Sequence, residues 1–174
     1  VLHCLVSACG RGEAFEELRT DALDRAFDIV AESRRNGLFP DAITYSSLMS
    51  GCVNAGEPQR ALALYDEMET KSVARTASVY ATAIHACATE YDYDNSAPNY
   101  RKAFKIWEEV QQNKPRVVVD PVLYATILTV ASRAGNVEMC ANLIREMEMN
   151  GSMMSPAVVS NMCGSVARAG GAGA

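Results

Sequence analysis

The sequence predicts an all-α fold, a right-handed superhelical α-solenoid of tandem helix-turn-helix hairpins. Two observations support this prediction. Shifting the sequence against itself by 35 residues places Tyr45 on Tyr80, and a shift of 79 residues places Asp41 on Asp120, with further matches in the same register. Within a unit, two apolar stripes at helical spacing flank a glycine-containing turn. Such short hairpins cannot bury both stripes alone, so neighbouring units must stack and share a core.

The second unit, residues 42–76, provides the template for the others. Its first helix, helix A, is indicated by apolar side chains at i, i+3, i+4, i+7 and i+8, namely Tyr45, Leu48, Met49, Cys52 and Val53. An Ala55-Gly56 turn follows. The second helix, helix B, has the same kind of stripe in Ala61, Leu64, Tyr65 and Met68. The fourth unit, residues 121–155, repeats this pattern.

Two other units fit the template with insertions between their helices. The first unit, residues 1–41, has its helix-A stripe at Leu5, Val6 and Cys9 and its helix B over residues 26–35. The third unit, residues 77–120, has its stripes at Tyr80, Ala83, Ile84 and Cys87 and at Ala103, Ile106, Trp107 and Val110, with extra residues around 90–98. Surface turns tolerate such insertions because closing a longer loop costs little entropy. Trp107 is therefore predicted to lie in the core.

The whole chain, residues 1–174, is interpreted as one solenoid segment. Its last unit, residues 156–174, contains helix A without helix B. The chain begins without Met and stops inside the repeat pattern, so we expect it to be a piece of a longer protein.

Composition narrows the classes of function. The chain has 174 residues and a net charge of −5, which argues against tight, non-specific binding of nucleic acid. Its longest apolar stretch, residues 117–131, is too short to span a membrane. The six cysteines are dispersed, lack zinc-ligand spacing and are predicted to be reduced. We expect no metal, no cofactor and no catalytic site, because no nucleophile stands near a base in the pattern.

Two stretches carry a family resemblance. The segments PDAITYSSLMSGCVNAGEPQRALALYDEME and DPVLYATILTVASRAGNVEMCANLIREME closely resemble the pentatricopeptide repeat, with its Asp, helix-A tyrosine, Ala-Gly turn and closing Glu-Met. The period of 35 residues favours this repeat over the tetratricopeptide repeat of about 34 residues. The resemblance implies recognition of single-stranded RNA, one base per repeat, through hydrogen bonds to base edges and apolar contacts. As partners we expect neither a membrane nor a small-molecule substrate.

The resemblance also indicates which residues contact RNA. A base is selected by the residue after the helix-A tyrosine together with the last residue of the repeat, which gives the pairs His3 with Asp41, Ser46 with Thr76, Ala81 with Asp120, and Ala125 with Ser155. Apolar wedges beside the base are expected at Ile43 and Val122, while the equivalent positions hold Ser78 and Ala157. The phosphate-contacting position near the end of helix A holds Arg11, Asn54, Thr89, Arg133 and Arg168. Ala81 and Ala125 have no donor or acceptor, so they depart from the family's usual pairs.

Other patterns receive structural interpretations. Acids on the second helices are interpreted as a solvated outer face; they are Asp66, Glu67, Glu108, Glu109 and Glu146. Cys9, Cys52 and Cys87 share one repeat position and are interpreted as small core residues. A metal site at His85 and Cys87 is a weak alternative. The insertion at residues 90–94 alternates acids with tyrosines, which is typical of a surface loop, with docking on a basic protein as the alternative.

Two functions follow from these expectations. The first is an RNA-binding module of an organellar pentatricopeptide repeat protein that acts in transcript stabilisation, processing, splicing or translation, supported by Arg11, Arg133 and Arg168. The second is a protein-interaction or structural segment of an organellar ribosome or another large assembly, favoured by the acidic net charge. A third hypothesis places an enzymatic domain in the remainder of a longer protein. The family implies an organelle, with the chloroplast slightly favoured over the mitochondrion.

Overall fold

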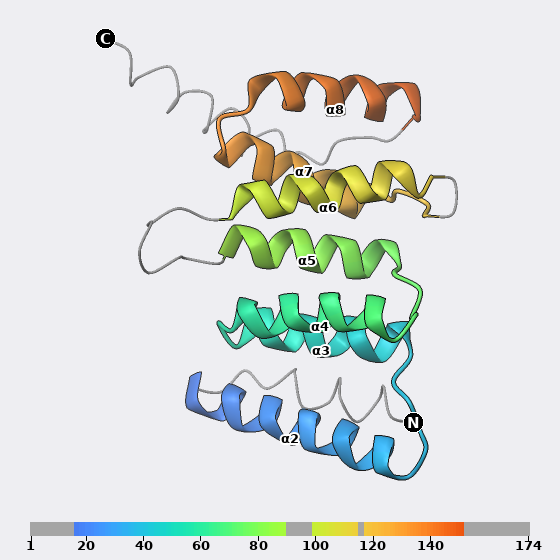
Figure 1. Cartoon of the computed structure of the whole chain (residues 1–174). Coiled ribbons are helices and arrows are strands. Elements are labelled where there is room, and N and C mark those ends of the chain that lie inside the picture. Colours follow the sequence, from blue (N-terminus) through green and yellow to red (C-terminus); the bar gives the residue numbers. More distant parts are fainter. Residues whose placement is uncertain (1–15, 90–98, 115–116, 152–174) are drawn as a thin grey trace.

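The computed structural model describes residues 16–89, 99–114 and 117–151, with side chains from residue 21. Every regular element in these ranges is a helix; they are α2 (Glu16–Arg35), α3 (Ala42–Asn54), α4 (Pro58–Thr70), α5 (Ala77–Thr89), α6 (Tyr100–Gln112), α7 (Pro121–Arg133) and α8 (Val137–Met149). Figure 1 shows them stacked along one axis, from α2 at one end to α8 at the other. The described part of the chain is thus an array of tandem helical hairpins, as predicted.

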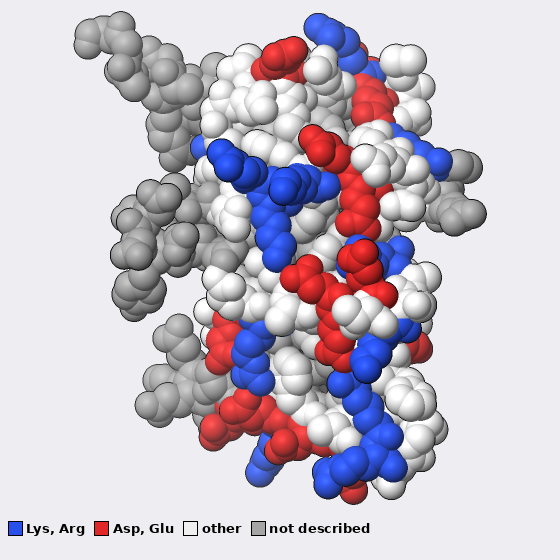
Figure 2. Space-filling model, viewed as in Figure 1, with Lys and Arg blue, Asp and Glu red and all other residues white. Residues whose placement is uncertain are grey.

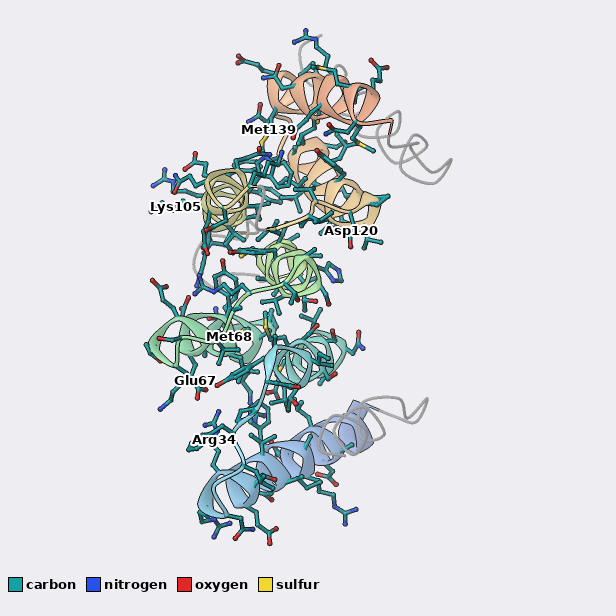
Figure 3. All side chains as sticks on the ribbon, turned by 90° about the vertical axis from the view of Figure 1, so that its right-hand side faces the viewer. Arg34, Glu67, Met68, Lys105, Asp120 and Met139 are labelled. Carbon is teal, nitrogen blue, oxygen red and sulfur yellow. The ribbon has the colours of Figure 1, made fainter. Side chains whose placement is uncertain are left out.

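The helices form two layers. α3 packs on α4, α5 on α6 and α7 on α8 as hairpins, while α3 also packs on α5 and α5 on α7. Figure 3 shows α4 and α6 on one side of the stack and α3, α5 and α7 on the other. We call the second group the helix-A layer, and α2, α4, α6 and α8 the helix-B layer. Contacts of α4 with α5 and of α6 with α7 join the hairpins into one continuous core.

Capping side chains determine where the helices of the helix-A layer begin. Asp41 and Asp120 precede α3 and α7 in extended backbone conformation. Their carboxylates accept hydrogen bonds from the backbone N–H groups of Thr44 at 2.8 Å and Leu123 at 2.7 Å. Each cap satisfies an N–H group that has no partner within the helix. Pro121, which directly follows its cap, fits the first helical position because it lacks an N–H group.

Glycine determines the turn from helix A to helix B. Gly56 and Gly135 have φ angles of 76° and 69°. This left-handed region is accessible to glycine without the steric cost that a Cβ atom imposes. The Ala-Gly pairs recognised in the sequence therefore end α3 and α7 and reverse the chain into α4 and α8.

The apolar stripes predicted from the sequence form the core. In the second unit all the stripe residues are buried except Val53, which is half-buried, and in the third unit all eight are buried. Trp107 is only 6 % exposed and lies 5.8 Å from Tyr124, measured between ring centroids. Its predicted place in the core is confirmed. Burying each large apolar side chain contributes about 1.5–3 kcal/mol, so the stacked repeats stabilise one another.

The described cysteines are core residues. Cys52 and Cys87 are fully buried at equivalent places on α3 and α5, and Cys140 is buried on α8. Burial raises the pKa of the Cys52 thiol to about 12. At neutral pH this side chain is therefore a neutral, compact apolar group, which confirms the packing interpretation for Cys52 and Cys87. Cys9 lies outside the described residues.

The prediction for helix B of the first unit is wrong at its start. α2 begins at Glu16 rather than at residue 26, so much of the supposed insertion is helical. Leu23 is buried together with Ala26 and Val30, and these residues lie on one stripe at i, i+3 and i+7. The segment before residue 26 is also rich in good helix formers, which favours the longer helix.

Other sequence predictions fall on residues that the structure does not describe. These are the helix-A stripe of the first unit, the insertion at residues 90–98 and the partial unit at residues 156–174. They stay predictions. Among the helices of the described ranges, none combines the length and the apolar character needed to cross a membrane.

Candidate nucleic-acid interface

One face of the helix-A layer is open to solvent. On α3, α5 and α7 the second, fifth, sixth, ninth and thirteenth residues are all half-buried or exposed. We call this set the helix-A face; its members are Ile43, Ser46, Ser47, Ser50, Asn54, Ser78, Ala81, Thr82, His85, Thr89, Val122, Ala125, Thr126, Thr129 and Arg133. The set is rich in hydroxyl groups and contains no carboxylate of its own. Five of the hydroxyl groups donate to carbonyl oxygens of their own helices, so they offer a ligand acceptor oxygens; they belong to Ser47, Thr82, Thr89, Thr126 and Thr129.

Two serines of neighbouring repeats meet on this face. The hydroxyl oxygens of Ser46 on α3 and Ser78 on α5 lie 2.6 Å apart. Ser46 is a predicted base-selecting residue, and Ser78 holds the predicted wedge position of the next repeat. Either hydroxyl can donate or accept, so the pair offers adjustable hydrogen bonding to a ligand. Sequence reasoning did not predict this contact, because only the packing of α3 on α5 brings together residues 32 positions apart.

Two large apolar side chains also stand on this face. Ile43 is 55 % exposed and Val122 is 65 % exposed, although residues of these types are usually buried. Both hold the second position of a helix of the helix-A layer, where wedges beside a base are expected. The base-selecting positions Ala81 and Ala125 are half-buried and can provide packing but no hydrogen bond.

The last residues of the repeats have a structural role that sequence reasoning did not assign. Asp41 and Asp120 cap α3 and α7, and the Thr76 hydroxyl lies 3.4 Å from the backbone nitrogen of Val79 as a weaker cap of α5. Each predicted selector therefore stands at the start of a helix of the helix-A layer. Capping holds it beside the helix-A face in a fixed position, where a side-chain oxygen can also approach a ligand.

Positive charge on the helix-A face comes from α7. Arg133 is the last residue of α7 and is exposed. The pKa of His85 on α5 is lowered by burial and, to a smaller extent, by the charge of Arg133. The guanidinium charge therefore acts across the junction between two repeats. Asn54 and Thr89 hold the equivalent ends of α3 and α5 without a charge.

The remaining predicted contacts lie outside the described residues. They are His3, Arg11, Ser155 and Arg168. Their roles stay predictions.

A second polar cluster joins the repeats at the edge where α3, α5 and α7 begin. In three units, the helix-A tyrosine donates a hydrogen bond to a glutamate near the end of helix B, and a cation from the preceding unit pairs with that glutamate. We call these groups the junction triads; they are Tyr45, Glu67 and Arg34; Tyr80, Glu109 and Arg75; and Tyr124, Glu146 and Lys114. Figure 3 shows Arg34 reaching from α2 toward Glu67.

The junction triads correct the interpretation of the helix-B acids. Glu67, Glu109 and Glu146 are half-buried hydrogen-bond acceptors rather than members of a solvated face. Asp66 and Glu108 are exposed, as predicted. The difference arises because adjacent residues on a helix point about 100° apart, so one acid of each pair faces the next repeat and the other faces water.

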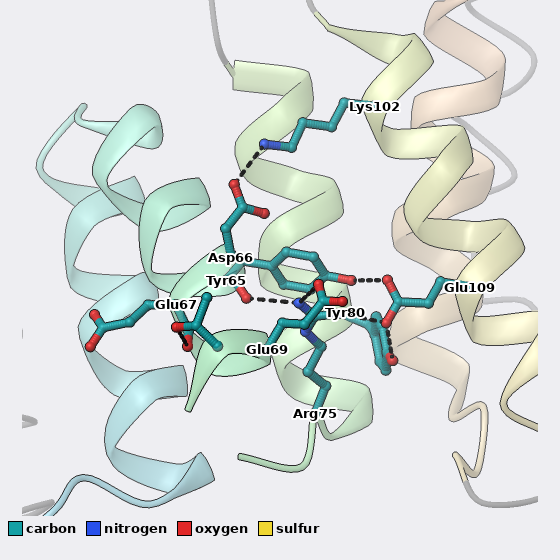
Figure 4. A network of polar contacts seen from close by, with 9 residues as sticks. Tyr65, Asp66, Glu67, Glu69, Arg75, Tyr80, Lys102 and Glu109 are labelled. Atoms are coloured by element: carbon teal, nitrogen blue, oxygen red, sulfur yellow. Dashed lines mark hydrogen bonds and ion pairs between the residues drawn. The ribbon is translucent and has the colours of Figure 1, made fainter. Parts of the chain in front are cut away.

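The central triad has an additional member (Figure 4). Glu109 accepts hydrogen bonds from the hydroxyl groups of Tyr65 at 2.7 Å and Tyr80 at 2.8 Å, and from Nη1 of Arg75 at 2.6 Å. The guanidinium of Arg75 also stacks on the Tyr65 ring, 4.0 Å from its centroid. A cation over an aromatic ring adds electrostatic attraction to the ion pair. Glu109 thus connects α4, α5 and α6.

The pKa shifts in this triad follow from its hydrogen bonds. Burial alone would raise the pKa of Glu109, but the hydrogen bonds from Tyr65, Tyr80 and Arg75 outweigh burial and lower it. Burial and the hydrogen bond to Glu109 raise the pKa of Tyr80 to about 12. At neutral pH the carboxylate is ionised and the tyrosine is protonated. Each group is locked in one protonation state, which suits a structural junction rather than proton transfer.

No metal centre is found within the described ranges. No group of three or more His, Cys, Asp or Glu residues there is arranged to hold a metal ion. The helix-A face is thus the only candidate surface on which several of the predicted site residues meet, as far as the described residues extend.

Comparison with family models decides the family. Residues 49–160 match the model described as the pentacotripeptide-repeat region of PRORP, which is more than half of the chain. The chain belongs to the pentatricopeptide repeat family. Two chloroplastic pentatricopeptide repeat-containing proteins of Arabidopsis thaliana are similar in sequence. One is 28 % identical over 148 residues, covering 84 % of this chain and 18 % of the relative. The other is 26 % identical over 116 residues, covering 67 % and 19 %.

Solved pentatricopeptide repeat structures share the fold. The repeat domain of Arabidopsis thaliana protein-only RNase P 1, in complex with tRNA, has a TM-score of 0.72 at 15 % identity, covering 94 % of this chain and 78 % of that domain. Maize PPR10 in complex with an 18-nt psaJ RNA element has a TM-score of 0.68 at 18 % identity, covering 97 % of this chain and 22 % of PPR10. The chain spans about a fifth of the length of the curated relatives it matches.

Proposed function

We propose that this segment binds single-stranded RNA along the helix-A face, within a larger organellar protein that acts in transcript stabilisation, processing, splicing or translation. The main support is the helix-A face itself, which runs over three successive repeats without a carboxylate and ends at Arg133. Two solved structures with the same fold contain RNA. The chloroplast is the proposed compartment, because the names of two relatives place them there.

The proposed binding mode uses each repeat junction as a site for one base. Ile43 and Val122 would contact base faces, while hydroxyl groups such as those of Ser46 and Ser78 would meet base edges. Asp41, Thr76 and Asp120 would contribute acceptor oxygens from the helix starts. Arg133 would contact a phosphate.

We expect modest sequence discrimination. A base edge is read by donors and acceptors, and the pair Ser46 with Thr76 supplies them on both sides. Ala81 and Ala125 supply none, so their repeats depend on Asp120 and on the undescribed Ser155 for selection. Binding would therefore depend more on stacking and phosphate contacts than on base identity.

The experiment is a binding titration of the whole chain with a panel of single-stranded RNA oligomers at two salt concentrations. Arg133→Ala should weaken binding to every oligomer and reduce the slope of log affinity against log salt by about 0.7, the value for one lost phosphate contact on a single strand. Arg145→Ala is the matched control, because Arg145 is exposed on α8 in the helix-B layer. Uniformly negligible binding of all oligomers would refute the proposal.

A second candidate function is protein interaction within a large assembly such as an organellar ribosome. Four large apolar side chains are exposed at the edge where helices of the helix-B layer end, namely Leu38, Phe39, Val118 and Met149. Phe39 and Val118 are each 77 % exposed and precede the helix caps Asp41 and Asp120 by two residues. Exposed apolar groups that recur along one edge are typical of docking surfaces.

The two candidates predict different results in the RNA panel. If protein docking is the function of the segment, no oligomer of the panel should bind, and Phe39→Ser and Val118→Ser should reduce the association of the chain through this exposed edge. If RNA binding is the function, Arg133→Ala should lower RNA affinity and the Ser variants should leave it unchanged. Sedimentation velocity of each variant, run beside the titration, measures both effects.

A further inference from the structure

A cluster of cations on α6 takes no part in the junction triads or in the helix-A face. Arg101, Lys102 and Lys105 occupy the first two turns of α6 and belong to a chain whose net charge is −5. Figure 2 shows Lys and Arg gathered over the first half of α6, with Asp and Glu bordering them toward the other edge. In Figure 3 the labelled Lys105 points away from the stack on the helix-B side.

The neighbourhood of these cations does not neutralise them. Lys102 lies 3.5 Å from a carboxylate oxygen of Asp66, which is itself 64 % exposed. No ion pair joins Arg101 or Lys105, both exposed, to a carboxylate of the described residues. Cations at the start of a helix are also repelled by the positive end of the helix dipole, and the first turn of α6 contains no acid. Residues that conflict with local stability in this way are typical of binding surfaces.

These cations stand on the same edge as the cationic end of the helix-A face. The backbone N–H of Asn99, which caps α6, donates to the carbonyl oxygen of Cys87 near the end of α5 at 3.0 Å. The charge of Arg133 contributes to lowering the pKa of His85, which lies in the same C-terminal half of α5 as Cys87. At the edge where helix A turns into helix B, cations therefore stand on both layers, Arg133 on α7 and Arg101 to Lys105 on α6, while Glu138 in the first turn of α8 is an exposed acid on the same edge.

We propose that the backbone of a bound RNA passes from the helix-A face over this edge onto the outer side of α6, where four cations contact its phosphates. We call these cations the basic rim; they are Arg101, Lys102, Lys105 and Arg133. The basic rim would hold nucleotides that flank the bases read on the helix-A face. This inference rests on the proposed RNA-binding function and extends it to a second surface.

The chemistry of the basic rim favours a polyanion over a protein partner. Protein interfaces bury apolar and aromatic side chains at their centre. Among the large apolar side chains that are exposed in the described ranges, Val137 stands alone at this edge, whereas Leu38, Phe39, Val118 and Met149 lie at the opposite edge. At the basic rim the exposed groups are mostly cations with long, mobile side chains. Such groups suit phosphates, whose spacing they can follow without a preformed pocket.

The test compares two RNAs on the whole chain: a short single-stranded oligomer, and the same oligomer extended by further single-stranded nucleotides. The double variant R101A/K105A removes two cations of the basic rim. The double variant R35A/K71A is the matched control, because it makes the same charge change at the opposite edge, where α2 and α4 end. All four side chains are exposed, so neither variant should disturb the core.

Two additional phosphate contacts would raise the salt slope on single-stranded RNA by about 1.4. Over a fourfold rise in salt, the unmodified chain should therefore lose roughly sevenfold more affinity for the extended RNA than for the short one. R101A/K105A should abolish this difference without changing affinity for the short oligomer, and R35A/K71A should leave the difference intact.

Equal salt dependence for the two RNAs, or equal behaviour of the two double variants, would overturn the basic rim and leave RNA binding on the helix-A face standing. Failure of both RNAs to bind would instead refute the proposed function, and this inference with it. Preferential binding of a polyglutamate peptide over the extended RNA, lost in R101A/K105A, would assign the basic rim to an acidic protein and also overturn the proposal.

Discussion

The hydroxyl of Tyr65 donates a hydrogen bond of 2.7 Å to Oε2 of Glu109, which lies 44 residues further along the chain. Tyr65 is on α4 and Glu109 on α6, so the bond joins the helix-B members of two consecutive repeats. The other carboxylate oxygen of Glu109 accepts from Tyr80 and Arg75. One side chain therefore connects two neighbouring hairpins through three hydrogen bonds, in addition to the apolar core that they share.

Replacing Glu109 should weaken this junction strongly. Glu109→Gln removes the negative charge that pairs with Arg75, whose side chain is only 10 % exposed. A largely buried cation that lacks a full negative partner lowers the stability of the folded state. The loss of stability is moderated because the side chain of Glu109 is 32 % exposed, so water screens part of the ion pair. The free energy of unfolding should fall by about 2–3 kcal/mol. Urea unfolding followed by the fluorescence of Trp107, the single tryptophan, measures the change in the same repeat.

The adjacent acid provides the control. Glu108 is exposed on the same helix, so Glu108→Gln makes the same chemical change and should alter the free energy of unfolding by less than about 0.5 kcal/mol. Equal effects of the two substitutions would show that the junction does not depend on the Glu109 contacts.

The junction glutamates should also make stability depend on acid pH. The pKa of Glu109 and that of Glu146 are both lowered, because hydrogen bonds and nearby cations outweigh the effect of burial. A group whose pKa is lower in the folded state stabilises the fold above its unfolded pKa, about 4.3 for glutamate, and loses this contribution as the pH falls through the folded value. The melting temperature should therefore fall below about pH 4.3. Melting curves of Glu109→Gln should show a smaller fall, because one of the two groups no longer titrates.

Local patterns explain how much of the fold could be predicted from the sequence. The stripe from Tyr45 to Cys52 and the Gly56 turn depend on neighbours within one hairpin, and the structure confirms both. The start of α2 differs from the sequence prediction, which begins helix B at residue 26 and so leaves Leu23 outside it. Its burial depends on α3, where Leu23 Cδ1 would lie 3.3 Å from a Cβ atom on Gly51. The contact with Gly51 itself leaves no local signal, although the spacing of Leu23 with Ala26 and Val30 does favour a helix that begins before residue 26.

The candidate site was predictable only in part, for the same physical reason. The exposure of Ile43 and Val122 follows from their place in the repeat. The hydrogen bond of Ser46 with Ser78 and the cations of the junction triads depend on contacts between repeats. Arg34 lies seven residues before its repeat ends, whereas Arg75 lies one residue before, yet both reach the equivalent glutamate. Measured to the glutamate, however, the interval is nearly constant, 34 residues for Arg75 and 32 for Lys114, so the repeat length is a signal that the sequence analysis did not use.

Gly56 should tolerate only residues that accept its backbone conformation. A Cβ atom there would meet nothing within 4 Å, so the effect of Gly56→Ala is confined to the backbone, whose φ is 76°. An L-residue in this region costs about 1–2 kcal/mol, and the free energy of unfolding should fall by that amount. Asparagine visits the same region more readily, so Gly56→Asn should cost less than Gly56→Ala. The urea midpoints of the two variants measure the difference, and an alanine variant as stable as the asparagine one would contradict the backbone argument.

Two substitutions of Asp120 should separate its role in capping α7 from its proposed role in selecting an RNA base. Its Oδ1 atom accepts the 2.7 Å hydrogen bond from the Leu123 N–H group. Asp120→Ala removes this cap and should lower the free energy of unfolding by about 1 kcal/mol, while Asp120→Asn retains a capping oxygen and should be nearly neutral. Stability alone therefore distinguishes alanine from asparagine at this position.

RNA binding distinguishes asparagine from aspartate. The carboxylate of Asp120 only accepts hydrogen bonds, whereas an asparagine amide both donates and accepts, so Asp120→Asn should change which base is preferred without changing stability. Titration of the folded variants with oligomers that differ at one base measures this preference. An Asp120→Asn variant with unchanged stability and unchanged base preference would limit Asp120 to capping, and selection in that repeat would then lack any polar group, because its partner Ala81 provides none.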